Sequence, residues 1–217
     1  MISIVFPVYI PSLGHKQMTD FNITKAKSLT REKCEWIIVE TGSSYYLEEA
    51  DVYIYERHKT SPANSINRAF KVSNNDFIVY LSNDVTVCDG WVEKMLECFN
   101  KHDNCGIASL GNNEHNDQER NEIVEDFYFS VCMMRKNDAW YSKDYKTNFL
   151  DTDLAFRVHR QGKKFYKNLS GKVYHKPHST VGKFSGDFDD YERSRKRFLD
   201  KWKIYADDPL YKRFGGI

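Results

Sequence analysis

The stretch Phe77-Ile78-Val79-Tyr80-Leu81-Ser82-Asn83-Asp84 decides the fold of this 217-residue chain. Its first five residues are aliphatic or aromatic, and residues of these types in a short run predict a buried strand. Polar residues follow at once. Ligands of open parallel sheets bind beyond the carboxyl ends of the strands, so Ser82, Asn83 and Asp84 are candidate binding residues.

Short apolar runs alternate with amphipathic stretches on both sides of this strand. The alternation predicts an α/β fold in which helices connect the strands of a largely parallel sheet. Further strands are expected at Ile2 to Phe6, Trp36 to Val39, Val52 to Tyr55 and Phe127 to Met134, and helices at residues 16–31, 61–72, 89–99 and 187–202. The sequence contains no internal repeat, and no linker separates a second domain. We therefore expect a single domain.

The composition excludes several classes of protein. A formal net charge of +1 gives no overall attraction to nucleic acid or to an anionic membrane. The five cysteines form no CxxC pair, which argues against a disulfide framework and against a thiolate zinc site. With no basic leader and no apolar stretch of about 20 residues, we expect a cytoplasmic protein without a transmembrane segment, which visits a membrane only peripherally.

Several well-known catalytic motifs are absent from the sequence. It contains neither a Gly-x-Gly-x-x-Gly fingerprint nor a Walker A loop, which removes the main dehydrogenase and NTPase alternatives. It also lacks the His-Glu-x-x-His zinc motif and the Gly-x-Ser-x-Gly elbow of hydrolases.

Asp84 is the first candidate for metal binding. A hard cation such as Mg²⁺ is held by one or two carboxylates, while diphosphate oxygens and water fill its remaining positions. A single well-placed Asp can therefore anchor such a cation. Position alone favours the simpler alternative that Asp84 caps a turn.

Three sequence blocks change this balance: Ile4 to Tyr9, Val39 to Ser44 and Leu81 to Val85. In their order and spacing they resemble glycosyltransferase family 2. The resemblance covers roughly Met1 to Lys183 and implies a GT-A fold, with a mixed, mostly parallel central sheet flanked by helices. It also implies that Asp84 ends the family's DXD motif and binds Mn²⁺ or Mg²⁺, with Ser82 replacing the first acidic residue.

The resemblance further implies a site for a nucleotide sugar. Glu40 stands where the family has the acidic residue of an Asp-x-Gly-Ser motif, which reaches the nucleotide base or ribose. Asn67 matches an asparagine that lies beside the nucleotide, and a solvated helix residue is the alternative. The implied nucleotide-sugar-binding residues are Pro7, Tyr9, Glu40, Gly42, Ser43, Asn67, Ser82, Asn83 and Asp84.

A fourth block, Phe149 to Arg157, resembles the family's Glu-Asp-x-Asp-Leu-x-x-Arg segment, with Leu150 in place of the Glu. The resemblance implies that Asp151 is the catalytic base. A carboxylate at a helix N-terminus is held in a fixed orientation and can accept a hydroxyl proton. Simple N-capping is the alternative role for Asp151. We expect Asp153 to orient structure, through Arg157 one turn on.

Two histidines follow a hairpin that we expect around Asn168 to Gly171. Family members often place a histidine here, which completes the metal site or touches the diphosphate. His175 is our first choice and His178 the reserve, and a purely structural histidine is the alternative. The segment Gly111 to Glu122 is almost wholly polar and predicts a mobile loop.

Together the resemblances of these blocks to the family imply a metal-dependent, inverting glycosyltransferase that moves a sugar from a nucleoside-diphosphate sugar to an acceptor hydroxyl. Residues 1–110 are expected to be the nucleotide-sugar-binding half, 111–183 the acceptor and catalytic half, and 184–217 a C-terminal helical tail. A UDP-sugar is the favoured donor. The acceptor is expected to be a saccharide, a lipid-linked molecule or a protein.

Two alternatives stay open. Basic residues in the tail could contact phosphate, so a phage-type DNA glycosyltransferase acting on a hydroxymethylated base in the host cytoplasm is the first. We favour an ordinary solvated helix for the tail, since acidic residues offset its charges. Ser82 and Leu150 in place of family carboxylates leave a non-catalytic sugar-nucleotide binding module as the second alternative.

Overall fold

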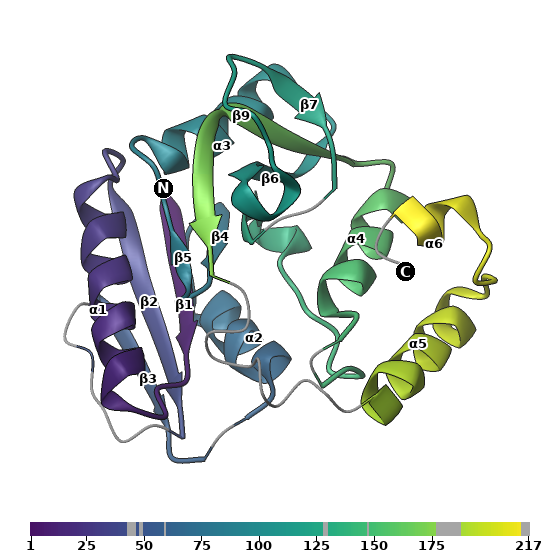
Figure 1. Ribbon diagram of the computed structural model, residues 1–217, viewed down its shortest axis with the longest axis horizontal. Coiled ribbons are helices and arrows are strands. Elements are labelled where there is room, and N and C mark those ends of the chain that lie inside the picture. The colour runs from purple at the N-terminus through teal and green to yellow at the C-terminus, as the bar shows by residue number, and fades with distance from the viewer. Residues whose placement is uncertain are drawn as a thin grey trace.

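The computed structural model describes residues 1–42, 47, 50–58, 60–127, 130–146, 148–176 and 188–213. Nine strands in this part of the chain form one sheet, which helices cover on both faces (Figure 1). The strands are β1 (Ile2–Val8), β2 (Cys34–Thr41), β3 (Val52–Glu56), β4 (Phe77–Leu81), β5 (Val85–Thr86), β6 (Cys105–Asn112), β7 (Ile123–Glu125), β8 (Val131–Arg135) and β9 (Lys164–His175). The helices are α1 (Leu13–Ser28), α2 (Pro62–Val72), α3 (Trp91–Lys101), α4 (Leu150–Arg160), α5 (Phe188–Trp202) and α6 (Pro209–Arg213).

The sheet is parallel on its N-terminal side and mixed beyond it. Its strand order is β3-β2-β1-β4-β8-β6-β9-β5, and β7 pairs with β9. Strand β1 lies parallel to β2 and β4, and β2 lies parallel to β3. Strand β8 is antiparallel to both β4 and β6, whereas β6 and β9 run parallel. The sequence led us to expect a mixed, mostly parallel sheet; the sheet is mixed, and four of its eight described strand pairings are antiparallel.

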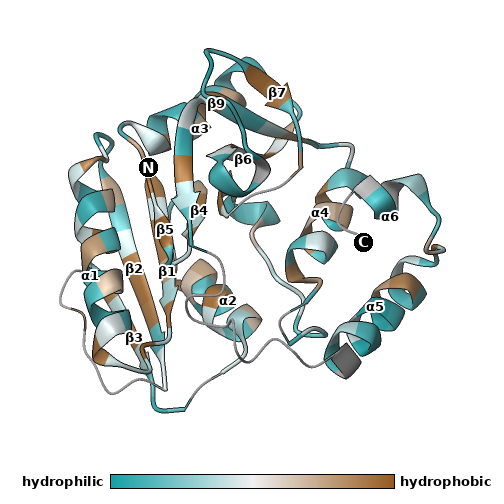
Figure 2. Cartoon of the chain, viewed as in Figure 1, coloured by the Kyte–Doolittle hydropathy of each residue, from teal (hydrophilic) through white to brown (hydrophobic). Residues whose placement is uncertain are grey.

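Alternating side chains of the strands fill two cores. Ile4 and Phe6 of β1 pack with α1 and α3 on one face, whereas Val5 packs with α2 and α4 on the other. Successive side chains of a strand point to opposite faces, so a strand that is apolar throughout must be covered on both. Figure 2 shows the resulting hydrophobic colour along β1 and β2, between helices with polar outer surfaces.

Local signals in the sequence correctly predict where helix α2 begins. Its N-cap is Ser61, whose hydroxyl accepts a hydrogen bond from the Asn64 backbone N–H, and Pro62 occupies the first turn. Proline suits this place because its missing N–H and fixed φ match the start of a helix. The predicted start of this helix is therefore confirmed.

The sequence-based prediction of a hairpin around Asn168 to Gly171 is wrong. Strand β9 runs on to His175, and it pairs with β6 on both sides of an irregularity at residues 169–171. Gly171 is needed there, since a Cβ atom would lie 2.7 Å from the Lys94 side chain and 2.8 Å from the Cys88 sulfur. The bulge thus lets β9 extend towards the carboxyl ends of the parallel strands.

The polar segment Gly111 to Glu122 is more regular than the predicted loop. Gly111 and Asn112 end β6, and a 3₁₀ turn follows at Asn113–His115. The Asn112 backbone N–H donates to an Asp117 carboxylate oxygen at 2.9 Å, and its side-chain amide donates to the Ser130 hydroxyl at 2.9 Å. These bonds hold the turn in one place.

Helix α5 packs against α4 through buried aromatic residues (Figure 1). Phe198 is fully buried, and its ring meets that of Phe156 edge-on with centroids 4.8 Å apart. The helix predicted at residues 187–202 is confirmed. Within the described residues, none of the helices combines the length and the apolar character that crossing a bilayer requires.

Candidate functional site

Strand pairing brings Asp84 and His175 together. Asp84 follows β4, and the next residue, Val85, pairs with His175 at the end of β9. The Lys176 backbone N–H also donates to the Asp84 carbonyl at 3.0 Å. As a result, the His175 Nε2 atom lies 3.4 Å from an Asp84 carboxylate oxygen.

Glu114 holds the other side of the His175 ring. Its carboxylate lies 2.6 Å from Nδ1, while Asn113 accepts from the His175 backbone N–H at 2.7 Å and donates to its carbonyl at 3.1 Å. Burial disfavours the charged imidazole, but hydrogen bonds and negative charge from Asp84 and Glu114 outweigh it and raise the pKa of His175 to about 9. In this metal-free state the ring therefore carries a proton at neutral pH.

The residues present fit a divalent cation that the protein shares with a ligand. Asp84 and His175 supply one carboxylate and one imidazole, and Glu114 directs Nε2 towards Asp84, as carboxylates behind metal-binding histidines commonly do. Among the described residues, no group of three or more His, Cys, Asp or Glu side chains is arranged to hold a metal by itself. Phosphate oxygens and water would have to complete the coordination.

Ser82 and Asn83 support Asp84 in different ways. The Ser82 hydroxyl donates to the Asp84 carboxylate at 2.5 Å. Asn83 is buried against helix α1, where its amide donates to the Thr19 hydroxyl at 3.2 Å and its carbonyl accepts from Asn22 at 2.9 Å. The two residues therefore fix the turn that carries Asp84. Contact of either residue with a nucleotide stays a prediction.

Asp151 lies in the first turn of α4, where the pKa of its carboxyl is raised. The N-cap is Phe149, so the alternative of Asp151 as the N-cap is wrong. Protein atoms displace water around the carboxyl and raise its pKa to about 6, and the nearby Tyr141 hydroxyl opposes this rise.

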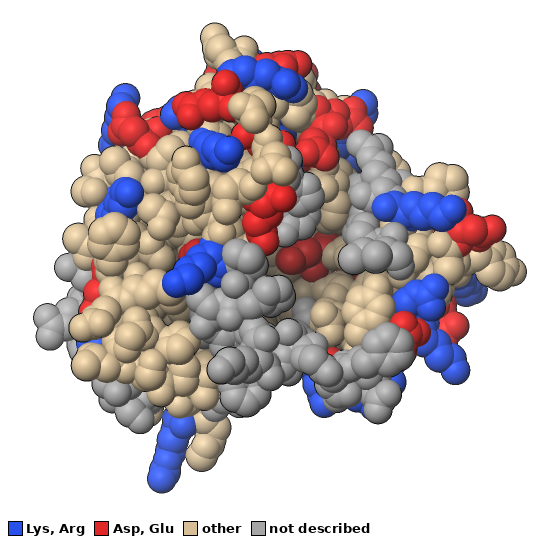
Figure 3. All heavy atoms as spheres, viewed as in Figure 1, with Lys and Arg blue, Asp and Glu red and all other residues tan. Residues whose placement is uncertain are grey.

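Tyr80 of β4 is affected by the charges of both carboxylates. Burial raises the pKa of its hydroxyl above the ordinary value, and the negative charges of Asp151 and Asp84 raise it further. Its ring also lies 6.2 Å from that of Tyr141, measured between centroids. Both carboxylates therefore act on one hydroxyl at the end of β4. The face in Figure 3 is hollowed near its centre, and acidic side chains lie at that hollow.

The remaining candidates at the ends of β1 and β2 share the same edge of the sheet. In the strand register, Pro7 lies opposite Val39, and Glu40 lies opposite Val8. Glu40 is buried, and Tyr9 is half-buried just after β1. Gly42 has a φ of 64° and donates its N–H to the Glu56 carbonyl at 2.8 Å, which suits glycine. Ser43 and His178 lie outside the described residues.

Asn67 is buried, so the alternative of a solvated helix residue is wrong. Its amide donates to the Tyr141 carbonyl at 2.7 Å, and its side-chain oxygen accepts from the Tyr141 N–H at 2.8 Å. Asn67 therefore fixes the backbone of the residue whose hydroxyl lies near Asp151. Its contact with the nucleotide stays a prediction.

The partner that we predicted for Asp153 is also wrong. Arg157 donates to the carbonyls of Asp138 and Trp140 at 2.8 and 2.5 Å. Asp153 instead pairs with Lys201 of α5, whose Nζ lies 2.8 Å from the carboxylate. The prediction used the local rule that residues one helical turn apart can pair. Tertiary packing against α5 overrides that rule here.

Sequence reasoning missed three residues of the site: Tyr80, Glu114 and Tyr141. Tyr80 is a strand residue with no polar neighbours in sequence, and Tyr141 lies in a loop, so neither carried a signal. Glu114 did carry one, because Asn112-Asn113-Glu114 is a polar run directly after the apolar strand that ends near Leu110. The same reasoning that selected Asp84 would have selected Glu114.

Comparison with solved structures places the fold among known glycosyltransferases. The mannosyltransferase PcManGT from Pyrobaculum calidifontis, in complex with GDP-Man and Mn²⁺, matches with a TM-score of 0.65 and 11% identity over 90% of this chain and 64% of that one. TarS 1-349 of S. aureus gives 0.59 and 11% over 80% and 60%, and GalNAc-T7 with UDP, GalNAc and Mn²⁺ gives 0.65 and 11% over 96% and 50%. At this identity the likeness shows the fold alone.

These comparisons confirm the fold class expected from the sequence. This chain spans between one half and slightly under two thirds of each of those three chains. No curated protein matches its sequence. The family model of glycosyl transferase family 2, however, matches residues 3–186, which include the strand ends that carry Glu40 and Asp84, the Asp151 helix and His175. The chain therefore belongs to glycosyl transferase family 2.

Proposed function

We propose that this protein is a metal-dependent, inverting glycosyltransferase that moves a sugar from a nucleoside-diphosphate sugar to an acceptor hydroxyl. One observation carries the proposal. The Asp84 carboxylate and the His175 ring lie 3.4 Å apart at the carboxyl edge of the parallel strands, and Asp84 and Asp151 both act on the Tyr80 hydroxyl. A cation-binding pair and a candidate base thus share one site.

Asp84 and His175 would hold Mn²⁺ or Mg²⁺, which supplies neutralisation of the charge that grows on the departing diphosphate. Asp151 accepts the proton of the acceptor hydroxyl. With a pKa of about 6, its carboxyl is mostly ionised at neutral pH yet basic enough to take a proton in the transition state. A bond forms from the acceptor oxygen to the anomeric carbon as the bond from that carbon to the diphosphate oxygen breaks. This single displacement inverts the anomeric centre.

Pro7, Tyr9, Glu40, Gly42, Ser43 and Asn67, with the Ser82-Asn83-Asp84 turn, are proposed to hold the nucleotide sugar. The support is the shared edge of the sheet for the residues that end β1 and β2, and the family membership for the whole set. Two similar structures contain GDP-Man or UDP together with Mn²⁺. We propose a UDP-sugar donor, a saccharide or lipid-linked acceptor, and work in the cytoplasm or at a membrane surface.

In the part of the chain that the structure describes, no observation favours DNA as the acceptor. Basic residues of α5 pair with acidic ones: Arg193 lies 3.7 Å from Asp190, and Arg195 lies 3.6 Å from Glu192. On the face in Figure 3, cationic and anionic side chains are interspersed. Phage-type modification of DNA therefore stays an untested alternative. The retained carboxylates of Asp84 and Asp151 support an enzyme over a non-catalytic binding module.

The test is release of nucleotide from a panel of UDP-, GDP-, CMP- and dTDP-sugars with Mn²⁺ or Mg²⁺. We expect slow, metal-dependent release from one donor, which Asp84→Ala abolishes and which the surface control Asp103→Asn leaves intact. With a matched acceptor, the product's anomeric configuration, read by NMR, should be opposite to that of the donor. Metal-independent release would contradict the proposed metal dependence. A product of retained configuration would contradict the proposed inversion.

A further inference from the structure

We propose that the C-terminal helices α5 and α6 position the Asp151 carboxylate by anchoring the residues on either side of it. The inference rests on the proposed role of Asp151 as the base. Two anchors carry it, Phe149 before Asp151 and Asp153 after it. Helix α5 supplies partners to both anchors, and α6 supplies a partner to Phe149.

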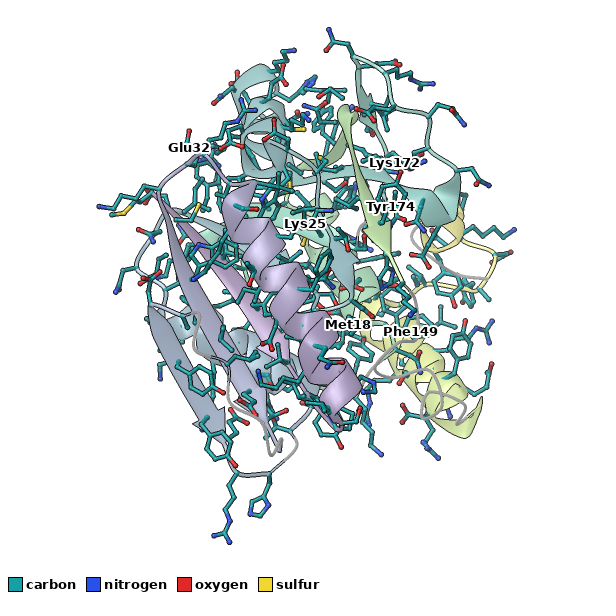
Figure 4. The ribbon with its side chains drawn as sticks, turned by 60° about the vertical axis from the view of Figure 1, so that its left-hand side comes forward. Met18, Lys25, Glu32, Phe149, Lys172 and Tyr174 are labelled. Atoms are coloured by element: carbon teal, nitrogen blue, oxygen red, sulfur yellow. The ribbon has the colours of Figure 1, made fainter. Side chains whose placement is uncertain are left out.

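The first anchor is Phe149, which has a left-handed backbone with a φ of 68°. Residues with a Cβ atom rarely adopt this conformation, and it persists only where the surroundings impose it. Here the surroundings are aromatic: Phe149 is 8% exposed, and ring centroids of Tyr191, Phe198 and Tyr211 lie 5.4, 5.3 and 6.4 Å from that of its ring. Figure 4 shows Phe149 beside the C-terminal helices.

The second anchor is Asp153, whose side chain is only 4% exposed. The Trp202 indole N–H donates to its carboxylate at 2.9 Å, the Tyr145 hydroxyl donates at 3.3 Å, and the Lys201 ammonium lies 2.8 Å away. A buried carboxylate is stable only with such partners. Two of the three partners are consecutive residues at the end of α5.

The two anchors are also joined to each other. The Asp153 backbone N–H donates to the Phe149 carbonyl at 2.9 Å, which closes the first turn of α4 around Leu150, Asp151 and Thr152. Asp151 therefore sits in a turn that α5 fixes at both ends. Displacement of a reacting group by about 1 Å can lower the rate of a reaction about 100-fold. Trp202, Lys201 and Phe149 are thus positioning residues, since they act through Asp151.

Trp202→Phe tests the inference, because it removes the indole N–H but keeps a ring against Phe156 and Phe198. We expect kcat to fall between about 10- and 100-fold while the donor KM changes less than about twofold. The matched control is Lys196→Gln on the exposed side of the same helix. Lys201→Met should lower kcat in the same way, and Lys201→Arg should restore it, because the ion pair with Asp153 is regained.

Amide hydrogen exchange of the free protein provides a readout that does not depend on turnover. Trp202→Phe should speed exchange at residues 151–154 and leave exchange in β1 and β4 unchanged. Wild-type kcat with wild-type exchange in this variant would overturn the inference, as would a loss of donor binding in parallel with kcat. If Asp151→Asn keeps full activity, the proposed base is wrong, and the exchange data alone still decide whether α5 holds this turn.

Discussion

Replacing Glu114 with glutamine tests how the site sets the charge of His175 and, through that charge, the affinity for a cation. In the metal-free protein, burial disfavours the charged ring, but hydrogen bonds and negative charge from Asp84 and Glu114 outweigh it and raise the pKa of His175 to about 9. A cation that binds the ring must displace its proton. We therefore expect metal affinity to rise with pH up to about pH 9 and to level off above it, because below its raised pKa the ring must first lose its proton.

The size of the effect on metal affinity follows from the raised pKa of His175. At pH 7 the ring lies two pH units below its pKa, so about 1% of it is neutral, and apparent affinity is reduced about 100-fold, or about 2.7 kcal/mol. The stability of the metal-free fold changes with pH in the opposite direction. Protonation of His175 stabilises the metal-free fold fully below pH 6.5, and this contribution is lost as pH rises through about 9. Glu114→Gln removes one negative partner and should lower the pKa of His175 by about one unit.

Two measurements follow this change. A histidine NMR titration without metal gives the pKa of His175 in both proteins. Calorimetry with Mn²⁺ at several pH values, in buffers of different ionisation heat, gives affinity and protons released. In the wild type we expect nearly tenfold tighter binding per pH unit and about one proton released per Mn²⁺ at pH 7. Glu122→Gln is the control, since that carboxylate pairs with Arg120 and is 52% exposed.

Either of two results would contradict the prediction that Glu114 sets the charge of His175 and that the cation displaces its proton. A Mn²⁺ affinity that is constant between pH 7 and 9 would show that the cation displaces no proton from His175. A Glu114→Gln protein that titrates like the wild type would show that Glu114 does not set the charge of the ring.

Three further predictions concern other parts of the molecule. Asp151→Asn should lower transfer about 1,000-fold with nucleotide affinity unchanged, and wild-type kcat/KM should rise with pH through about 6 as the carboxylate ionises; a flat profile there would count against it. Lys167→Met should lower the free energy of unfolding by about 3 kcal/mol in urea titrations, because the fully buried ammonium pairs with two carboxylates; unchanged stability would show that the pairs contribute nothing net. Asn67→Ala should cost about 2 kcal/mol, because both hydrogen bonds to the Tyr141 backbone disappear; an unchanged Tm would contradict this.

Local features of the fold could be predicted from the sequence. The strand at Phe77–Leu81 and the helix start at Ser61 depend on apolar runs, a hydroxyl cap and a proline, all within a few residues. The order of the blocks also indicated the family, which the match over residues 3–186 confirms.

Long-range pairing could not be predicted in the same way. His175 reaches Asp84 only because β9 pairs with β5, which lies about 90 residues earlier, and that pairing needs the bulge at Gly171. The left-handed Phe149 depends on aromatic rings that follow it by more than 40 residues. In each case the deciding contact joins segments that the sequence pattern alone does not connect.

The most direct test of the central claim is calorimetry of nucleoside diphosphate binding with and without Mn²⁺. UDP and GDP should be titrated into the wild type, Asp84→Asn, His175→Gln and the control Asp103→Asn. We expect Mn²⁺ to tighten binding of one nucleotide at least about tenfold in the wild type and the control, and we expect either site variant to lose this gain. Equal affinity with and without Mn²⁺ in the wild type, or an undiminished gain in Asp84→Asn, would contradict it.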